Sequence, residues 1–590
     1  MRISAGCNIG GFKVLKDPEL LARLPKEARG RVLVANIKEI GDMGAPADGL
    51  PGLELFIDDQ PLTLARYPNE GYMRVVAVHG ATPIDVRGTI GAVEGIVEYE
   101  DERPQRWLQE KEPMALGFWF WDWAEYRQGI AAIDVDKQQL TLAEPPSNYG
   151  YRAGQWFYGF NLFSEIDQPG EWYLDRETGD LFVWPPEGAG ETFSAMVSMG
   201  EDIVHMQDVR DVVFAGFVFE GARRHGLVLE NCERVRVERS VLRNLGSWAV
   251  RVSGGSAVEI IGCDISGTGD GGIALEGGER RTLTPGKHRA ANNHIHHYSR
   301  WNRTYRPGIS LHGVGLVAAR NLIHHAPHEA IAFGGNEMLI EGNEIHNVSA
   351  ESNDAGAIYA LRDWSMRGHV IRYNYLHHLY GHEGKGCHGV YLDDNFSSAH
   401  VYGNIFVAAR RPVLFGGGRD NILENNIFYQ CDQPLHIDAR GLGWRAYGRE
   451  QLTKKLSDMP YTEEPWRTRY PELLTLLADE PMAPKGTLVA RNIFFGGQWA
   501  NIQEAAQPYV HFADNLIDVD PHFADAANGD FSLRADSPAL ARGFVPIPLE
   551  KIGLYEAPER ALWPVEHAVT KREFAHQLAR EKAVPRQIAQ

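Results

Sequence analysis

The chain has 590 residues, with 59 Lys and Arg against 78 Asp and Glu, and its formal net charge is -19. This charge and the absence of any Lys/Arg-rich run argue against nucleic acid or an anionic membrane as a partner, whereas a neutral or sparsely charged carbohydrate is compatible with them. A chain of this length exceeds one compact core, so we expect two large parts, one of them a solenoid.

The cysteines and the first residues set expectations about the compartment. Five scattered cysteines imply no disulfide framework, and Cys232 and Cys263 are expected to pack inside the solenoid as small apolar residues. The string MRISAGCNIGGF has no charged n-region and no long apolar stretch, so the chain as given is expected to be cytoplasmic. The same string reads like the middle of a strand-turn pattern, and a trimmed start would make the protein periplasmic or secreted. Nothing in the sequence sets the oligomeric state or requires a cofactor.

Residues 1–195 carry alternating apolar segments that are broken by Pro and Gly. The segment 170–186 places a DRETG turn between two aromatic strands, which is typical of a hairpin. The pattern predicts an antiparallel β domain of sandwich type. The densest aromatic run is GFWFWDW at 117–123, which fits either the core of this domain or a sugar-stacking wall, with Trp121 leaning over the solenoid.

Residues 196–535 repeat a short unit. Its first turns begin at Val212, Val235 and Val258, 23 residues apart, and each contains short apolar strands split by Gly, Asn and Asp. An asparagine recurs at the same point of the unit, at Asn293, Asn321, Asn343, Asn374, Asn404, Asn426, Asn492 and Asn515. Such a period predicts a parallel β-helix, an all-β solenoid in which stacked asparagines hydrogen-bond the turns.

Histidines follow the asparagines at the same turn. They are His297, His324, His325, His346, His377 and His378. We expect them to stack or to cap turns rather than to bind a metal, because no zinc-type spacing is present.

Two insertions interrupt the repeat. The loop 279–289 is charged, and the segment 445–484 reads as helical and is expected to pack beside a binding groove. Shorter loops enlarge the coils near 347–356 and 378–388. Residues 536–590 are expected to form a cap and a tail, with 568–590 fairly helical.

Aligned strands of consecutive coils identify the candidate site. Ile331, Ile358, Val390, Val413 and Leu435 fall on the inner face, with Phe333, Ala360, Leu392, Phe415 and Ile437 inside two residues later. The outward positions and strand ends then supply the candidate substrate-binding residues Tyr359, Arg362, His388, Tyr391, Arg419, His436 and Asp438, to which we add Trp121.

The acids on these strands suit glycosidic hydrolysis. Strands one or two rungs apart place side chains roughly 5 to 10 Å from each other, the range in which two carboxyl groups can cleave a glycosidic bond. Crowding of Asp363, Asp393 and Asp394 raises the pKa of one acid, while a nearby arginine holds another ionised. Acids at strand ends also cap turns or form ion-pair ladders, which is the purely structural alternative.

The chain also resembles a known family. The strings LARYPNEGY, PGEWYLDRETGDLFVWPP, SNDAGAIYALRDWSMRGHVIRYN, GVYLDDNFSS, GGGRDNILENNIF and WRTRYPEL are similar to those of the right-handed parallel β-helix glycosidases of glycoside hydrolase family 141. The resemblance implies a xylan-acting or α-L-fucoside-acting hydrolase with a pair of catalytic aspartates, at Asp354 in SNDAGAIY and Asp394 in GVYLDD.

The register and the resemblance favour different aspartates. Asp354 lies eight strand positions before the residue that pairs with Asp394, about 26 Å on a straight strand, whereas Asp363 lies one position away. We therefore rank Asp354 and Asp394 first on resemblance, with Asp393 and Asp363 behind them on register. Two alternatives remain open, a polysaccharide lyase or epimerase that uses a Tyr, His, Lys or Arg base, and a non-catalytic glycan-binding protein.

Overall fold

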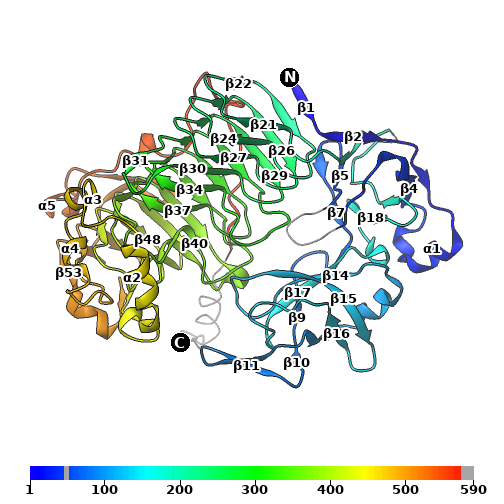
Figure 1. The fold of residues 1–590 in the computed structure, drawn as a ribbon, viewed down its shortest axis with the longest axis horizontal. Coiled ribbons are helices and arrows are strands. Elements are labelled where there is room, and N and C mark those ends of the chain that lie inside the picture. Colours follow the sequence, from blue (N-terminus) through cyan, green and yellow to red (C-terminus); the bar gives the residue numbers. More distant parts are fainter. Residues whose placement is uncertain (46–51, 191, 498, 573–590) are drawn as a thin grey trace, which may run out of the picture.

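The computed structural model describes residues 1–45, 52–190, 192–497 and 499–572. Its centre is a solenoid of three parallel sheets, which Figure 1 shows in green beside the N-terminal part in blue and cyan. Three strands succeed one another in each coil, one in each of what we name the front, side and rear sheets. The predicted parallel β-helix with N-terminal antiparallel sheets is confirmed.

The three sheets run the length of the solenoid. The front sheet comprises β21 (Val204–Gln207), β24 (Leu227–Glu230), β27 (Val250–Ser253), β30 (Ile273–Glu279), β34 (Ile309–Val314), β37 (Ile331–Asn336), β40 (Gly356–Leu361), β43 (His388–Asp393), β46 (Arg411–Gly416), β49 (Leu435–Asp438) and β52 (Asn501–Ile502), with β31 (Thr284–Pro285) paired to β30. The side sheet comprises β22 (Val213–Ala215), β25 (Arg236–Glu238), β28 (Glu259–Ile261), β32 (Arg289–Ala291), β35 (Val317–Ala319), β38 (Leu339–Glu341), β41 (His369–Arg372), β44 (Ala399–Tyr402), β47 (Ile422–Glu424), β50 (Thr487–Ala490) and β53 (Val510–Ala513). The rear sheet comprises β1 (Arg2–Ser4), β23 (Val218–Glu220), β26 (Val241–Leu245), β29 (Asp264–Thr268), β33 (His294–His296), β36 (Leu322–His324), β39 (Glu344–His346), β42 (Tyr375–Leu379), β45 (Ile405–Ala409), β48 (Ile427–Tyr429), β51 (Ile493–Phe495) and β54 (Leu516–Ile517).

The predicted register of the front sheet is confirmed. Ile331 pairs with Ile358, Ile358 with Val390, and the column continues through Val413 to Leu435, all fully buried. Each such side chain, removed from water, contributes roughly 1.5–3 kcal/mol of hydrophobic stabilisation. The alternate positions therefore face outward, where chemistry can take place.

An asparagine ladder closes the turn before the rear sheet. From Asn293 to Asn515, each side-chain amide donates to the Oδ1 of the asparagine in the next coil over 2.8–3.1 Å. The same Oδ1 also accepts from the backbone N–H of the preceding asparagine, as Asn343 does from Asn321. The predicted structural role of the column is confirmed.

The histidines stack on the rear sheet, as predicted. The ring centroids of His324 and His346 lie 4.7 Å apart and those of His346 and His377 lie 4.8 Å apart, with nearly parallel planes. Burial lowers the pKa of His346 to about 3 and that of His294 to about 2, so these rings are neutral at physiological pH. The rear sheet thus carries a column of uncharged imidazoles.

The N-terminal part contains two packed units rather than the single sandwich that we expected. A five-stranded sheet, β3 (Lys13–Val14), β4 (Leu33–Asn36), β7 (Thr63–Leu64), β18 (Glu171–Asp175) and β19 (Asp180–Val183), shares an apolar core with a four-stranded sheet, β2 (Gly6–Ile9), β5 (Leu55–Ile57), β6 (Gln60–Pro61) and β20 (Ala195–Ser198). The predicted DRETG hairpin joins β18 to β19. The eight-stranded sheet has a core of its own and comprises β8 (Arg66–Tyr67), β9 (Met73–Arg74), β10 (Ala77–His79), β13 (Ile96–Glu98), β14 (Met114–Phe118), β15 (Tyr126–Asp134), β16 (Gln139–Leu142) and β17 (Trp156–Phe160). Outside these sheets lie helix α1 (Pro18–Arg23) and the hairpin of β11 (Pro83–Val86) and β12 (Thr89–Ala92).

The division at residue 195 needs one correction. Strand β1 pairs in parallel with β23, so residues 2–4 belong to the rear sheet of the solenoid and not to the N-terminal sheets. Periodicity could not show this, because three residues are too few to display it.

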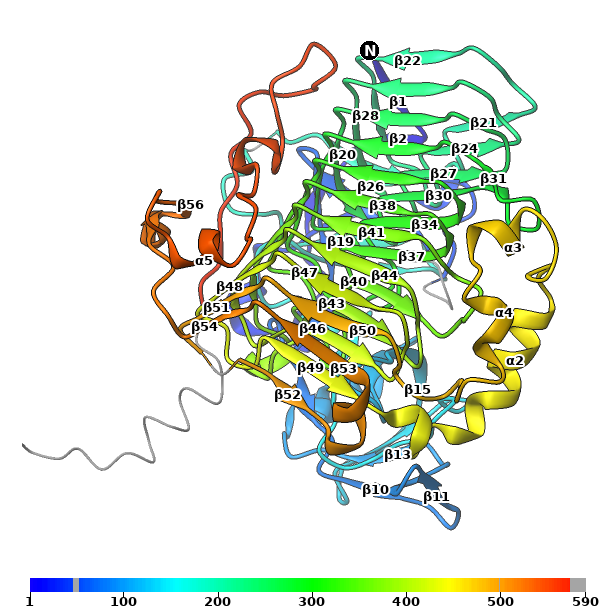
Figure 2. The ribbon, with the colours of Figure 1, turned by 90° about the vertical axis from the view of Figure 1, so that its left-hand side faces the viewer.

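The insertion at 445–484 is helical, as expected. It contains α2 (Arg449–Ser457), α3 (Trp466–Arg469) and α4 (Leu473–Leu476), whose apolar side chains pack around Trp364. Figure 2 shows these helices, in yellow, on one side of the solenoid.

The C-terminal segment, in orange and red, lies on the other side (Figure 2). After β55 (Phe523–Asp525), β56 (Asp530–Leu533) and α5 (Pro538–Ala541), the chain runs back along the solenoid. Arg560 donates to the carbonyl of Cys263, and the Thr570 N–H donates to Asn347. The predicted helical tail is absent over 568–572, and its remainder at 573–590 lies outside the described residues. Within the described ranges, no helix is long and apolar enough to cross a membrane.

Candidate active site

Three aspartates gather on the outer face of the front sheet, and we call Asp354, Asp393 and Asp394 the aspartate cluster. Asp393 ends β43, Asp394 follows it in the turn, and Asp354 precedes β40 on the neighbouring rung. The backbone of Asp354 and Asp394 is left-handed, with φ of 51° and 44°. Such turns are uncommon for residues other than glycine and re-aim the side chains at the ends of the strands.

Asp393 lies at the centre of the cluster. Its Oδ2 accepts a hydrogen bond from the Tyr359 hydroxyl at 3.0 Å, and its Oδ1 forms an ion pair with Arg440. Burial, with help from the neighbouring Asp394 charge, raises its pKa to about 6, although Arg440 acts in the opposite direction. Since 14% of its side chain remains exposed, Asp393 is a carboxyl group that can hold a proton near neutral pH and still meet a ligand.

Asp394 has a different environment, although it is the next residue. Arg362 and Arg445 contact its Oδ2 at 2.7 and 3.1 Å, and Arg440 contacts its Oδ1 at 3.3 Å. Only 5% of its side chain is exposed. Asp394 therefore forms the centre of a buried ion-pair network, which positions Arg440 against Asp393.

Asp354 comes back towards β43 through the left-handed turn, so the separation from Asp394 of about 26 Å that a straight strand would give does not arise. The Tyr391 hydroxyl donates to its Oδ1 at 3.1 Å. The residue is exposed to solvent, yet the protein atoms around it desolvate its carboxyl and raise its pKa. The charge of Asp354 in turn contributes to the raised pKa of Asp393, so the two carboxyl groups interact.

Aromatic rings connect the N-terminal part with this cluster. Trp121 and Trp123 are stacked at 6.3 Å with an interplanar angle of 5°, Trp123 meets Tyr305 at 6.3 Å, and Tyr305 meets Tyr359 at 6.3 Å. The remaining aromatic residues of the run, Phe118 to Phe120, are buried. The first part of GFWFWDW therefore forms core, whereas Trp121 and Trp123 are half-buried and stacked, with Trp123 against Tyr305 of the solenoid. A role for Trp121 in stacking on sugar stays a prediction.

The other predicted residues divide into two groups. His388 packs on the ring of Tyr391 at 4.6 Å, and Arg440 holds Asp438 through two nitrogens, with His436 at 3.9 Å from the same carboxyl. These residues surround the cluster. Asp363 instead accepts from Ser365 and lies 3.9 Å from Arg280, so its side chain points away from the cluster.

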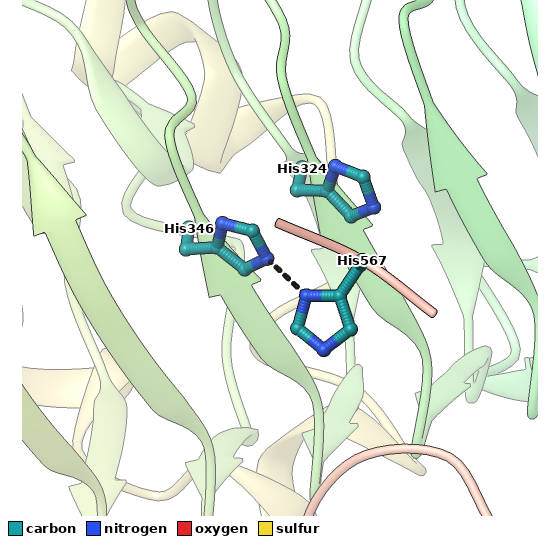
Figure 3. A group of neighbouring side chains, drawn as sticks. All are labelled: His324, His346 and His567. Carbon is teal, nitrogen blue, oxygen red and sulfur yellow. Dashed lines mark hydrogen bonds between the residues drawn. The ribbon is translucent and has the colours of Figure 1, made fainter. Parts of the chain in front are cut away.

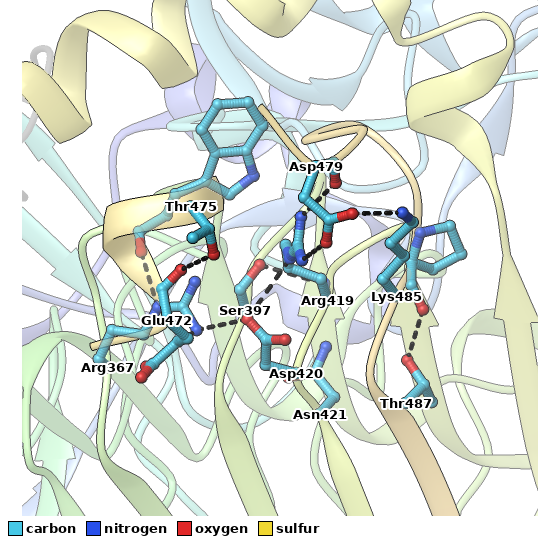
Figure 4. A network of polar contacts seen from close by, with 12 residues as sticks. Arg367, Ser397, Arg419, Asp420, Asn421, Glu472, Thr475, Asp479, Lys485 and Thr487 are labelled. Atoms are coloured by element: carbon cyan, nitrogen blue, oxygen red, sulfur yellow. Dashed lines mark hydrogen bonds and ion pairs between the residues drawn. The ribbon is translucent and has the colours of Figure 1, made fainter. Parts of the chain in front are cut away.

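Arg419 also lies apart from the cluster. Figure 4 shows it in a polar network that joins the solenoid to the helical insertion. Its guanidinium donates to the carboxyl group of Asp479 at 3.0 Å, and its Nε lies 3.5 Å from Asp420. The alignment placed Arg419 at a strand end. It could not show that the helical insertion, some sixty residues later, would bind the guanidinium group of Arg419.

Sequence reasoning missed several residues of the site. Arg440 follows the end of β49 and was not among the predicted substrate-binding residues, and Tyr305 comes from a loop that the strand alignment did not include. Glu329 precedes β37 and is 1% exposed. Its Oε1 accepts no hydrogen bond from the described residues and lies 3.7 Å from Nδ1 of His328, whose pKa burial lowers to about 3, so that ring is neutral. Burial raises its pKa to about 8, and its charge would act on Tyr305 and Tyr359. The sequence could have identified Glu329, because EAIAF, which begins at Glu329, aligns with GAIYA of the next coil.

Two hollows continue along the same face of the front sheet. They measure about 440 and 390 Å³ and share Glu276 and His312 in their walls. One reaches back to Trp248, and the other reaches Met366 in the loop that follows β40. Neither hollow is lined by Asp354, Asp393 or Asp394, so they are recesses separate from the aspartate cluster.

Comparisons with known proteins agree with the fold. Residues 202–297 match the family model described as "Right handed beta helix region". A solved structure described as "Glycoside hydrolase" is 12% identical, with 95% of this chain and 86% of that chain covered and a TM-score of 0.51. "The complex structure of XylC with xylose" is 11% identical over 89% of this chain and 76% of that chain, with a TM-score of 0.38. The "complex structure of alginate lyase AlyF-OU02 with G6" is 12% identical over 60% and 86%, with a TM-score of 0.29. No curated protein matches the chain. At these identities the likeness shows a shared fold, and activity has to be argued from the site.

Proposed function

We propose that this protein is a glycoside hydrolase that cleaves a plant or algal polysaccharide or oligosaccharide, of the xylan or fucosylated type, as the resemblance to glycoside hydrolase family 141 implies. The observation that supports this most strongly is the pair of accessible carboxyl groups on Asp354 and Asp393. Each accepts a hydrogen bond from a tyrosine, and these tyrosines, Tyr391 and Tyr359, face each other across neighbouring strands. Hydrolysis of a glycosidic bond needs two such groups with unequal affinity for a proton.

The environments of the two carboxyl groups suggest a division of roles. Asp393, which holds its proton up to about pH 6, protonates the leaving oxygen. Asp354, exposed and free of ion pairs among the described contacts, acts as the nucleophile or base. Asp394 then serves as a positioning residue through Arg440, which changes our first pairing of Asp354 with Asp394.

The test is product release from xylans, fucosylated oligosaccharides and uronans. Compared with the wild type, Asp354→Asn and Asp393→Asn should each lose about 10²–10⁴-fold in kcat/KM. The exposed Asp518→Asn, on the final coils, is the matched control and should keep full activity. Full activity in both cluster variants would contradict the proposal and favour a non-catalytic glycan-binding protein.

An activated substrate separates the two roles. An aryl glycoside with a good leaving group needs no protonation, so Asp393→Asn should regain most of its activity on it while Asp354→Asn should not. Recovery in Asp394→Asn instead of Asp393→Asn would restore the pairing that the resemblance implies.

The form of the product distinguishes the lyase alternative. A lyase would use Tyr391 or His388 as base and a free cation to neutralise the uronate, yet Arg440 is already paired with three carboxyl groups. Unsaturated products that absorb in the ultraviolet would establish a lyase and contradict hydrolysis.

A further inference from the structure

The imidazole column of the rear sheet meets one histidine that is not part of the repeat. His567 belongs to the C-terminal segment, which lies against the rear sheet more than two hundred residues away in the chain. One ring nitrogen from each of His324, His346 and His567 lies within 4.8 Å of the others. Figure 3 shows the rings of His324 and His346 on neighbouring strands, with the ring of His567 brought against them by a separate segment. Stacking along the strands accounts for the first two rings but not for the third.

Hydrogen bonds fix the proton of His346. The Nδ2 of Asn347 donates to the carbonyls of Thr570 and His378, which identifies the other side-chain atom as the oxygen. That oxygen accepts from the Thr570 N–H and lies 2.8 Å from Nδ1 of His346. A neutral His346 therefore carries its proton on Nδ1, and its Nε2 presents a lone pair.

The charge beside His567 favours the complementary arrangement. Its Nε2 lies 3.9 Å from Oε1 of Glu344, which also lies 3.4 Å from Nε2 of His377. A proton on Nε2 of His567 is attracted to this carboxylate, which leaves a lone pair on Nδ1. The Nδ1 of His567 and the Nε2 of His346 are 3.0 Å apart, so two lone pairs face each other.

A cation between these two nitrogens would satisfy both lone pairs, in place of the direct N–H···N hydrogen bond that a proton on one of them would form. We propose that His324, His346 and His567 form a binding site for a divalent transition metal of the zinc type, which fastens the C-terminal segment to the solenoid. Zinc binds imidazole nitrogen at about 2.0–2.1 Å, so two ligands of one ion lie about 3.0–3.4 Å apart, close to the separation of the His346 and His567 nitrogens. His324 can supply the third nitrogen when its Nδ1–H donates to Nδ1 of His325, 2.6 Å away, because its Nε2, 2.8 Å from Nε2 of His294, then carries a lone pair.

The surroundings are those of a metal site. Metal-bound histidines normally donate their second ring nitrogen to an oxygen acceptor, as His346 does to Asn347 and His567 is placed to do to Glu344. Imidazole ligands suit Zn²⁺, Cu²⁺ and Ni²⁺ rather than Ca²⁺ or Mg²⁺. The side chain of His567 is 23% exposed, which leaves room for water as a further ligand. This site is on the rear sheet and is independent of the aspartate cluster on the front sheet.

The experiment uses full-length protein from which any affinity tag has been removed. The protein is treated with a chelator, dialysed, and titrated with ZnCl₂ by calorimetry, and in parallel with CoCl₂ by visible absorption. We compare the wild type with His567→Ala and, as control, His511→Ala, an exposed histidine of β53 that lies away from the column. The wild type and His511→Ala should bind one equivalent of zinc and show cobalt ligand-field bands.

The change at His567 should weaken zinc binding by about 100-fold or more and abolish the cobalt bands, because one of three ligands is lost. Since His567 lies in a surface segment, the variant should fold normally, and circular dichroism checks this. The proposal is overturned if the wild type binds no zinc in the titration, or if His567→Ala binds it as tightly as the wild type. It is equally overturned if binding is lost in His297→Ala but kept in His567→Ala, because the ligands would then belong to a different part of the histidine-rich turn.

Discussion

The hydrogen bond from Tyr359 to Asp393 allows a quantitative test of the proposed acid. The Tyr359→Phe variant removes the donor at 3.0 Å while it keeps the ring that packs on Tyr391 at 5.5 Å. That hydrogen bond stabilises the ionised carboxylate, so its loss must raise the pKa of Asp393.

The size of the effect follows from the geometry. A hydrogen bond to a charged group contributes about 1.5–3 kcal/mol. In the variant, water replaces part of this stabilisation, because Asp393 is not fully buried. A net loss of about 1.4 kcal/mol corresponds to a shift of about one pH unit. The acid is active when protonated, so activity falls as the pH rises through the pKa of Asp393, about 6 in the wild type. In Tyr359→Phe the alkaline limb of the profile should therefore move up by about one pH unit.

The assay is the pH dependence of kcat/KM on the best substrate, which reports the free enzyme. Tyr391→Phe is the matched variant, because its hydroxyl donates to Asp354 instead. It should raise the pKa of Asp354 and move the acidic limb upward, since the nucleophile or base must be ionised. An alkaline limb that stays in place in Tyr359→Phe, or moves only in Tyr391→Phe, would refute the assignment of Asp393 as the acid.

Three further predictions concern the ladder, the buried acid and the aromatic wall. Asn343→Ala removes four hydrogen bonds at a fully buried position of the ladder and should lower the free energy of unfolding by about 4 kcal/mol. Asn515 is half-buried at the end of the ladder, so Asn515→Ala should lower it by about half as much. Denaturant unfolding followed by circular dichroism compares the two variants. The buried carboxyl of Glu329 binds its proton more tightly in the folded state, so its stabilisation is complete below about pH 4.5 and is lost as the pH rises through about 8. Glu329→Gln should thus gain about 3 kcal/mol over the wild type at pH 7 and nothing at pH 4, and equal differences at both pH values would count against an unpaired acid. Trp121→Ala should raise KM about fivefold and leave kcat unchanged if its ring binds sugar away from the reacting bond, and an unchanged KM would assign the ring to packing alone.

The repeat made most of the solenoid predictable. A column such as Ile331, Ile358 and Val390 follows from a two-residue alternation, and a wrong register would have turned every apolar side chain outward. The asparagines were equally readable, because each coil presents the same residue at the same turn.

The candidate site was less predictable, because it depends on turns and on distant segments. Asp393 and Asp394 are neighbours with one chemistry in the sequence, and only the left-handed turn at Asp394 directs one to solvent and the other into a group of arginines. The position of Asp354 depends on a similar left-handed turn, which the two-residue alternation of a strand does not predict. Tyr305 and Arg445 come from loops, where no period indicates which coil they will contact.

Strand β1 has a consequence for how the chain is made. Its residues 2–4 bond to residues 218–220, so the partner of the first strand is synthesised more than two hundred residues later. At about 5–20 residues per second, the strand waits on the order of 10 to 40 s on the ribosome with its backbone unpaired. The N-terminal sheets can fold during that interval. Strand β23 of the rear sheet pairs with β1 only when the solenoid meets the N-terminal sheets. We therefore expect the first coil to be the slowest part of the solenoid to assemble and the part most dependent on chaperones during synthesis.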